Sequence, residues 1–255
     1  AATLLREGSV RVKNTLAAGG GGQTVIHTVQ ELESVLGEIA PPHLEGYGLV
    51  FERDLVDATT NSVGQVRIGR CVASYYGTQQ LTLNNRGHYC YGGSDLVVIR
   101  GGYRQLLELD LGEPMRLAVT QAMTYDRAVG EHYPEAILSR RNYDIIQGWD
   151  QHGRWHSGVL EQSWRIGGAS GPEVAALLAF EADPSLRVVR VASVERYGDG
   201  VVRPVDCRVH FDGIDPVEGR MQSYTAISAC ERRLPSRNRG VARARQRQLA
   251  PLVGR

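Results

Sequence analysis

Two carboxylates on neighbouring segments are the first residues here whose types and spacing suggest chemistry. Asp144 lies in an expected strand, 142–146, and Glu161 lies in another, 157–162. A tight turn between such strands favours antiparallel pairing, which would bring Asp144 near Glu161, while Ser163 shares the face of Glu161. Because Mg²⁺ typically takes one or two carboxylates plus phosphate oxygens, Asp144, Glu161 and Ser163 are predicted metal ligands. The alternative is a cluster of surface salt bridges.

Arginines flank this group. Arg165 is expected on the same face as Glu161, where its guanidinium can stabilise negative charge that develops in a reaction. Arg140 and Arg141 come just before the first strand and are expected to reach a terminal phosphate. Arg165 and Arg141 are therefore the predicted catalytic residues.

A run of glycines joins two further expected strands, 10–14 and 23–28. Its members are Gly19, Gly20, Gly21 and Gly22, followed by Gln23. Backbone N–H groups of such a run can approach a phosphate without Cβ clashes, and Lys13 on the preceding strand adds a point charge. Walker and dinucleotide-binding loops do not fit, because no Gly-Lys-Ser/Thr and no helix follows. The alternative is a flexible surface hairpin.

Lys13 is also the only lysine in the chain, whereas the other 28 basic residues are arginine. A compact ammonium and a planar guanidinium are not interchangeable, so the surviving lysine suggests a site that needs the former.

A charged segment ends the short expected strand 48–51. It consists of Glu52, Arg53, Asp54 and Leu55. The end of a buried strand can offer backbone groups to a purine while a carboxylate accepts from a sugar hydroxyl or an amine. A solvated loop is the alternative.

Hydrophobic periodicity predicts an α+β protein. Helices are expected at 29–39 (with Thr28 as cap and Glu31 in a capping box), 115–131 and 173–181, and further strands within 63–83 and at 95–100, 187–197, 205–211 and 222–230. Pro41 and Pro42 are expected to end the first helix.

Charge and cysteines restrict the class of protein. The net charge is +1, yet the segment 232–255 holds eight arginines and no acidic residue. This segment is predicted to be a disordered basic tail, and its lack of interleaved aromatic residues argues against nucleic-acid binding. No stretch is apolar enough to span a membrane. Four cysteines without a CxxC pair predict reduced thiols and a cytoplasmic location.

In order and spacing these groups resemble the ATP-grasp superfamily, which includes biotin carboxylase and D-alanine–D-alanine ligase. That family has a strand lysine, a glycine-rich loop, a Glu-x-x-Leu-like adenine hinge, a carboxylate and Glu-x-Asn-x-Arg. Lys13, AAGGGGQTVI, Glu52–Leu55 and VLEQSWR match in turn, over roughly residues 1–180. Segments such as YGGSDLVVIRGG also resemble an uncharacterised proteobacterial family placed near ATP-grasp proteins.

The resemblance implies two α+β lobes with antiparallel sheets that clamp ATP and Mg²⁺ (or Mn²⁺). It assigns 1–56 to a small lobe and 57–231 to a large lobe. The implied reaction joins a carboxylate to an amine or thiol through an acyl phosphate; the alternative is a catalytically silent nucleotide-binding module or scaffold. Ser163 departs from the family's Asn, and an N-terminal substrate lobe is expected to be missing. The substrates and the oligomeric state stay open.

Overall fold

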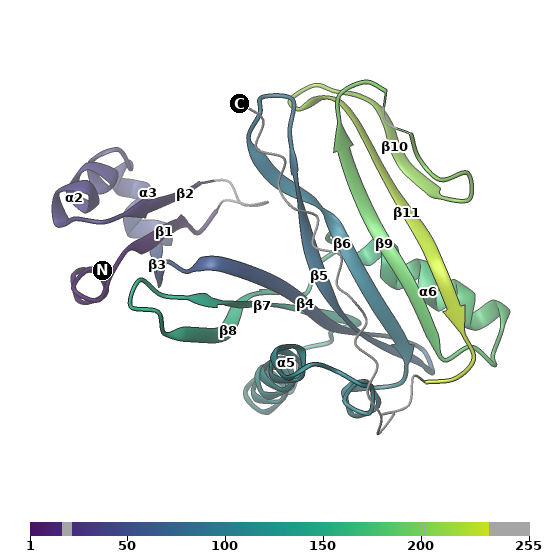
Figure 1. Ribbon diagram of the computed structural model, residues 1–255. Helices are drawn as coiled ribbons and strands as arrows, with labels where there is room; N and C mark the ends of the chain where they lie inside the picture. The colour runs from purple at the N-terminus through teal and green to yellow at the C-terminus, as the bar shows by residue number, and fades with distance from the viewer. Residues whose placement is uncertain (17–21, 201, 235–255) are drawn as a thin grey trace.

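The chain is an α+β protein with two antiparallel sheets, one of three strands and one of eight. The computed structural model describes residues 1–16, 22–200 and 202–234 (Figure 1). The predicted α+β class is therefore confirmed. Within the described residues, no helix has the length and apolar character needed to cross a membrane.

The first unit, here called the small lobe, is built on the three-stranded sheet. Its elements are α1 (Ala2–Leu5), β1 (Val10–Asn14), β2 (Gln23–Ile26), α2 (Val29–Gly37), α3 (Pro41–Tyr47) and β3 (Leu49–Arg53), with strand order β2-β1-β3. Val10 and Val12 are 0% and 3% exposed and pack in a core with Leu32 of α2. Because side chains alternate along β1, Arg11 and Lys13 project from the other face. The small lobe therefore presents one polar sheet face.

The helices of the small lobe follow local signals. Thr28 caps α2 by accepting from the Glu31 N–H at 3.1 Å, and the Glu31 carboxylate accepts from the His27 N–H at 2.6 Å. The expectation that Pro41 and Pro42 only end a helix is wrong: they occupy the first turn of α3. Proline is favoured there, because the first N–H groups of a helix have no partner within it.

The second unit, the large lobe, is built on the eight-stranded sheet with order β10-β11-β9-β6-β5-β4-β7-β8. The strands are β4 (Val56–Ile68), β5 (Cys71–Leu83), β6 (Tyr89–Arg100), β7 (Arg140–Trp149), β8 (Trp155–Ser163), β9 (Val188–Tyr197), β10 (Arg208–Asp215) and β11 (Gly219–Glu231), and the helices are α4 (Tyr103–Leu106), α5 (Glu113–His132) and α6 (Ser170–Ala182).

The helices cover the large sheet unequally. Helix α5 packs on one face against a core that includes Val63, Tyr143 and Ile145, each 0% exposed. Helix α6 packs on the other face, with Phe180 in a core that includes Tyr75 (Figure 1). Polar side chains continue this second face over β4, β7 and β8, and the candidate site described below lies there.

Several strands depart from their expected bounds, and β4, for example, begins at Val56 rather than at 63. Strand β6 begins at Tyr89, six residues before the expected 95, and β10 occupies Arg208–Asp215 where 205–211 was expected. The added parts contain glycines and polar residues, so hydrophobic alternation does not mark them. Pairing with β5 and β11 determines their extent instead.

A turn of the large lobe contacts the small lobe. The turn between β7 and β8 places the His152 ring 2.8 Å from the backbone oxygen of Glu7, and the Gln151 amide donates to the Ser9 hydroxyl. Asp150 organises this turn. Its carboxylate, with 2% of the side chain exposed, accepts from the backbone N–H groups of His152 and Arg154 at 2.9 Å each.

The same carboxylate holds two side chains, since the Arg154 guanidinium and the His156 ring each lie 2.8 Å from it. Burial alone would raise the pKa of Asp150. The hydrogen bonds from Arg154, His156 and the His152 N–H outweigh burial and hold that pKa well below its ordinary value. The ionised form is therefore the one that the fold stabilises.

We predict that Asp150→Asn lowers the melting temperature at pH 7 and that the difference from wild type shrinks as pH falls. A carboxylate whose pKa is depressed in the folded state stabilises the fold at every pH above its ordinary pKa of about 3.9. This contribution is lost progressively as the pH falls below that ordinary pKa towards the lower pKa of the folded state. Thermal melts between about pH 7 and pH 3 measure the effect. A difference that stays constant over this range would contradict the explanation.

Candidate functional site

The polar part of the large sheet borders a cavity of about 670 Å³, here called the central cavity. Its walls come from β4 to β9, from the loop between β8 and α6, and from the small lobe through Gln23. The lining residues used below are Ser62, Gln79, Tyr91, Ser94, Arg140, Asn142, Asp144, Glu161, Ser163, Arg165, Gly168 and Glu195. Four of the five residues predicted as metal ligands or catalytic arginines are among them: Asp144, Glu161, Ser163 and Arg165.

The pairing of β7 with β8 brings the predicted metal ligands together. Asp144 is directly opposite Glu161, and Asn142 is directly opposite Ser163, so all four side chains share one face. The expected hairpin geometry is therefore present. A register shift follows Asp144, where Leu160 of β8 lies between the pairs Asp144–Glu161 and Ile145–Val159.

Asp144 is held from one side only. Its Oδ1 accepts from Ser62 at 3.1 Å and from Asn142 at 2.9 Å, and Ser62 in turn accepts from Gln79 at 3.2 Å. Within the described part of the chain, no hydrogen bond reaches Asp144 Oδ2 or the Glu161 carboxylate. The sheet thus positions Asp144 Oδ2 and the Glu161 carboxylate at the cavity, where both can bind a cation or a substrate.

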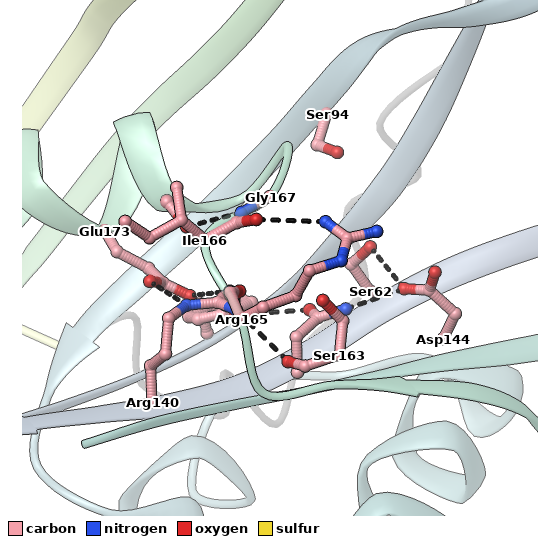
Figure 2. A network of polar contacts seen from close by, with 12 residues as sticks. Ser62, Ser94, Arg140, Asp144, Ser163, Arg165, Ile166, Gly167 and Glu173 are labelled. Atoms are coloured by element: carbon pink, nitrogen blue, oxygen red, sulfur yellow. Dashed lines mark hydrogen bonds and ion pairs between the residues drawn. The ribbon is translucent and has the colours of Figure 1, made fainter. Parts of the chain in front are cut away.

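A buried ion pair between Arg140 and Glu173 lies next to this group of residues (Figure 2). Arg140 is 8% exposed and Glu173 is 2% exposed, and their side chains form two parallel hydrogen bonds of 2.8 and 2.7 Å. The same guanidinium donates to the backbone oxygens of Ser163, at 3.1 Å, and of Arg165. One side chain therefore joins β7 to α6 and to the end of β8.

The Tyr75 hydroxyl extends this support. It lies 2.6 Å from Glu173 Oε1 and 3.0 Å from Asn142 Oδ1. Burial and the neighbouring Glu173 carboxylate raise the pKa of Tyr75 well above its ordinary value, so the hydroxyl keeps its proton. A continuous set of contacts thus runs from Glu173 through Tyr75 and Asn142 to Asp144.

Arg141 does not join the other candidates. It points to the opposite face of the sheet, where its Nε lies 3.2 Å from Asp126 of α5. Side chains alternate along β7, so Arg140 and Arg141 cannot both face Asp144. The expectation that Arg141 reaches a phosphate in this cavity is therefore corrected: Arg140 borders the cavity, and its guanidinium is bound to Glu173. Arg165 is exposed and projects along the cavity wall (Figure 2).

The predicted nucleotide residues of the small lobe form a separate group. Lys13 Nζ lies 2.5 Å from Glu52 Oε2, and Arg11 lies 2.6 Å from Asp54, all on the polar face of the three-stranded sheet. Arg53 turns away to Glu7, at 2.5 Å.

Only Gln23 of this group lines the central cavity among the described residues. Leu55 lies in the link between the sheets, near Gly148 of β7. Gly19, Gly20 and Gly21 lie outside the described residues, and Gly22 has φ +62°.

The far side of the central cavity carries hydroxyl groups. Tyr91 Oη lies 2.7 Å from Ser94 Oγ and 3.2 Å from Ser193 Oγ. A Cβ on Gly168 would come within 2.1 Å of the Tyr91 hydroxyl, so the loop before α6 needs glycine at this position. Burial raises the pKa of Glu195 on the same side.

Sequence reasoning missed several supporting residues. Tyr91, Ser94 and Asn84 line the cavity, and they belong to no motif described above. Glu173 was read only as part of a helix. The i, i+2 spacing of Asn142 and Asp144 was an available signal, whereas the partnership with Ser62 and Glu173 depends on tertiary structure.

Chemically, the cavity offers the paired carboxylates of Asp144 and Glu161, two further carboxylates from Glu195 and Glu218, the exposed Arg165 guanidinium and several neutral donors. No group of three or more His, Cys, Asp or Glu side chains with metal-binding geometry occurs in the part of the chain that the structure describes. A cation here would need further ligands from a substrate or from water.

Fold and site together define a class: a two-lobed α+β protein with a polar cavity on the large sheet beside the small lobe. The chain belongs to the family described as protein of unknown function (DUF3182), whose model matches residues 1–225. The search of curated proteins found no match.

We predict that Glu173→Ala lowers the free energy of unfolding by about 3–5 kcal/mol, because it leaves the buried Arg140 guanidinium without its partner. Urea denaturation measures this change. The matched control is Glu131→Ala, since the exposed Arg127–Glu131 pair at 3.9 Å should contribute less than about 1 kcal/mol. Equal effects of the two substitutions would show that the buried pair has no special role.

Proposed function

We propose that this protein is an ATP-grasp protein that binds ATP and Mg²⁺, and that it is a ligase joining a carboxylate to an amine or thiol through an acyl phosphate. The observation that supports this best is the convergence of Asp144, Glu161, Ser163 and Arg165 on one cavity beside a small lobe that carries Lys13. Their order along the chain agrees with the ATP-grasp pattern that the sequence resembles.

In this proposal the metal is held by Asp144 Oδ2, Glu161 and Ser163. Asp144 Oδ1 already accepts two hydrogen bonds, which orient the carboxylate so that its second oxygen faces the cavity. Bound Mg²⁺ would neutralise phosphate charge and hold the nucleotide in place. The protein adds Arg165, whose guanidinium can stabilise charge on the transferred phosphoryl group.

The small lobe would hold the rest of the nucleotide. Lys13 is 18% exposed in its side chain and now neutralises Glu52 at 2.5 Å. A phosphate is a competing anion for the same ammonium, and release of Glu52 would leave its carboxylate to accept from the sugar or the base. We therefore propose that nucleotide binding exchanges the Lys13–Glu52 contact for two contacts to the ligand.

The proposal predicts that Mg-ATP raises the melting temperature of the wild-type protein. A ligand at about 100 times its Kd stabilises the folded state by about 2.7 kcal/mol. Lys13→Ala should reduce the shift with or without metal, whereas Glu161→Ala should remove mainly its dependence on Mg²⁺. Glu131→Ala, on the exposed side of α5, is the control that should keep the full shift. Differential scanning fluorimetry measures all four proteins.

Absence of any ATP-dependent shift in the wild type would overturn the proposal. A second function, a silent nucleotide-binding module, is favoured by one observation: Ser163 stands beside Asp144 and Glu161 where the ATP-grasp pattern has Asn. ADP release distinguishes the two. Release that depends on a carboxylate and an amine from a substrate panel supports the ligase, and binding without release supports the module.

A further inference from the structure

A second cavity, of about 350 Å³, lies against the first turn of α5, on the face of the large sheet opposite the central cavity. Its lining includes Asp57, Asn61, Met115, Gln147, Trp149 and Trp155. None of these residues lines the central cavity or takes part in the proposed nucleotide chemistry.

Two indole rings border this cavity. Trp149 and Trp155 are directly paired across β7 and β8, and they are 46% and 41% exposed. Two large aromatic side chains therefore lie at the same cavity with almost half of their surface accessible. Met115 of α5 adds a polarisable thioether beside them.

A β-bulge places a carboxylate at the same cavity. The register of β4 against β7 shifts between Val56 and Thr59, and Asp57 in this bulge has φ +49°, the one positive value among the described non-glycine residues. Gly148 permits the bulge, since a Cβ there would lie 3.0 Å from the Val56 oxygen. Bulges and positive φ values of this kind redirect side chains and occur frequently at binding sites.

The floor of the cavity holds an amide acceptor. Asn61 is 3% exposed, and its Nδ2 donates to Gln147 Oε1 at 3.1 Å. The Gln147 amide nitrogen donates to the backbone oxygen of Pro114 at 2.8 Å, which fixes the orientation of both amides. Among the described residues no donor reaches Asn61 Oδ1. This oxygen is accessible, so it can accept a hydrogen bond from a ligand or lie beside a positive charge.

Asp57 is the one ionisable side chain among the described residues that line this cavity. In the adjoining first turn of α5, Glu113 adds a carboxylate that offsets the positive end of the helix, and Arg116 directs its guanidinium to the backbone oxygens of Leu107 and Leu109 at 3.0 and 3.2 Å. Carboxylate, carbonyl oxygen and indole faces all attract a cation, and a cation near indole rings gains further electrostatic stabilisation.

We propose that this cavity binds an organic cation of the alkylammonium class. The cationic head would lie against Trp149 and Trp155, with Asp57 as counter-ion and Asn61 Oδ1 as acceptor. This site is independent of ATP binding, and failure of either proposal leaves the other standing.

The two cavity tryptophans supply the measurement, since the third, Trp164, packs against the core under α5. Titration of the wild-type protein with choline should give a saturable change in tryptophan fluorescence. The same titration with 3,3-dimethyl-1-butanol, a neutral molecule of matching shape, and with sodium acetate should give none. An equal response to the neutral alcohol or to acetate, or no saturable response to choline, would overturn the proposal.

Variants locate the site. Asp57→Asn retains a residue that tolerates positive φ and should weaken choline binding about tenfold, as should Trp149→Ala. Asp199→Asn removes a carboxylate that is 96% exposed elsewhere and should leave binding unchanged, and Trp164→Phe should keep the fluorescence response. Circular dichroism establishes that each variant is folded. Unchanged choline affinity in folded Asp57→Asn would refute the assignment.

Discussion

The ion pair between Arg140 and Glu173 is the interaction on which the central cavity depends. It joins the first residue of β7 to the first turn of α6, and it also holds the backbone where β8 ends. A buried pair of this kind adds little net stability compared with apolar residues, but it fixes geometry because neither partner can lose the other without a large cost. Here the geometry that it fixes is the positions of Ser163 and Arg165 relative to Asp144.

This arrangement also explains why an arginine on the cavity wall is unsuited to bind a phosphate directly. The Arg140 guanidinium already makes contacts to the Glu173 carboxylate and to two backbone oxygens, which occupy its donors. Among the described residues, the Arg165 guanidinium makes one hydrogen bond, to the backbone oxygen of Ile166 at 2.9 Å, and the side chain lines the cavity. Two neighbouring arginines therefore have different tasks, one structural and one open to a ligand.

Most elements could be predicted from the sequence, because local signals determine them. The Thr28 cap, the alternation in Val10–Asn14 and the periodic apolar residues of α5 each lead to the observed element. Helix α3 was missed, since a proline pair is compatible with both the end of one helix and the start of another. Strand β6 was predicted too short because its first half, YCYGGS, is recognised only through pairing with β5.

The candidate site was predictable to a similar extent. The proximity of Asp144 and Glu161 could be predicted from antiparallel pairing across a tight turn, and the two residues are directly paired in β7 and β8. The direction of Arg141 could have been predicted from strand alternation, but only with the register of β7 in hand. The partners Ser62 and Glu173 are 82 and 29 residues from Asp144 in the chain, so no local pattern connects them. Such contacts follow from sheet order and helix packing, which one sequence does not specify.

The attachment of the small lobe has a mechanical consequence. It is joined covalently to the large lobe through Asp54 and Leu55, and it is also touched by the β7–β8 turn at Glu7 and Ser9. These places adjoin one another, because the Asp54 N–H donates to the Ser9 backbone oxygen at 3.0 Å, and Arg53 adds a contact to the His156 ring at 3.2 Å. The small lobe is therefore attached along one edge, and rotation about that edge is the movement that disturbs these contacts least.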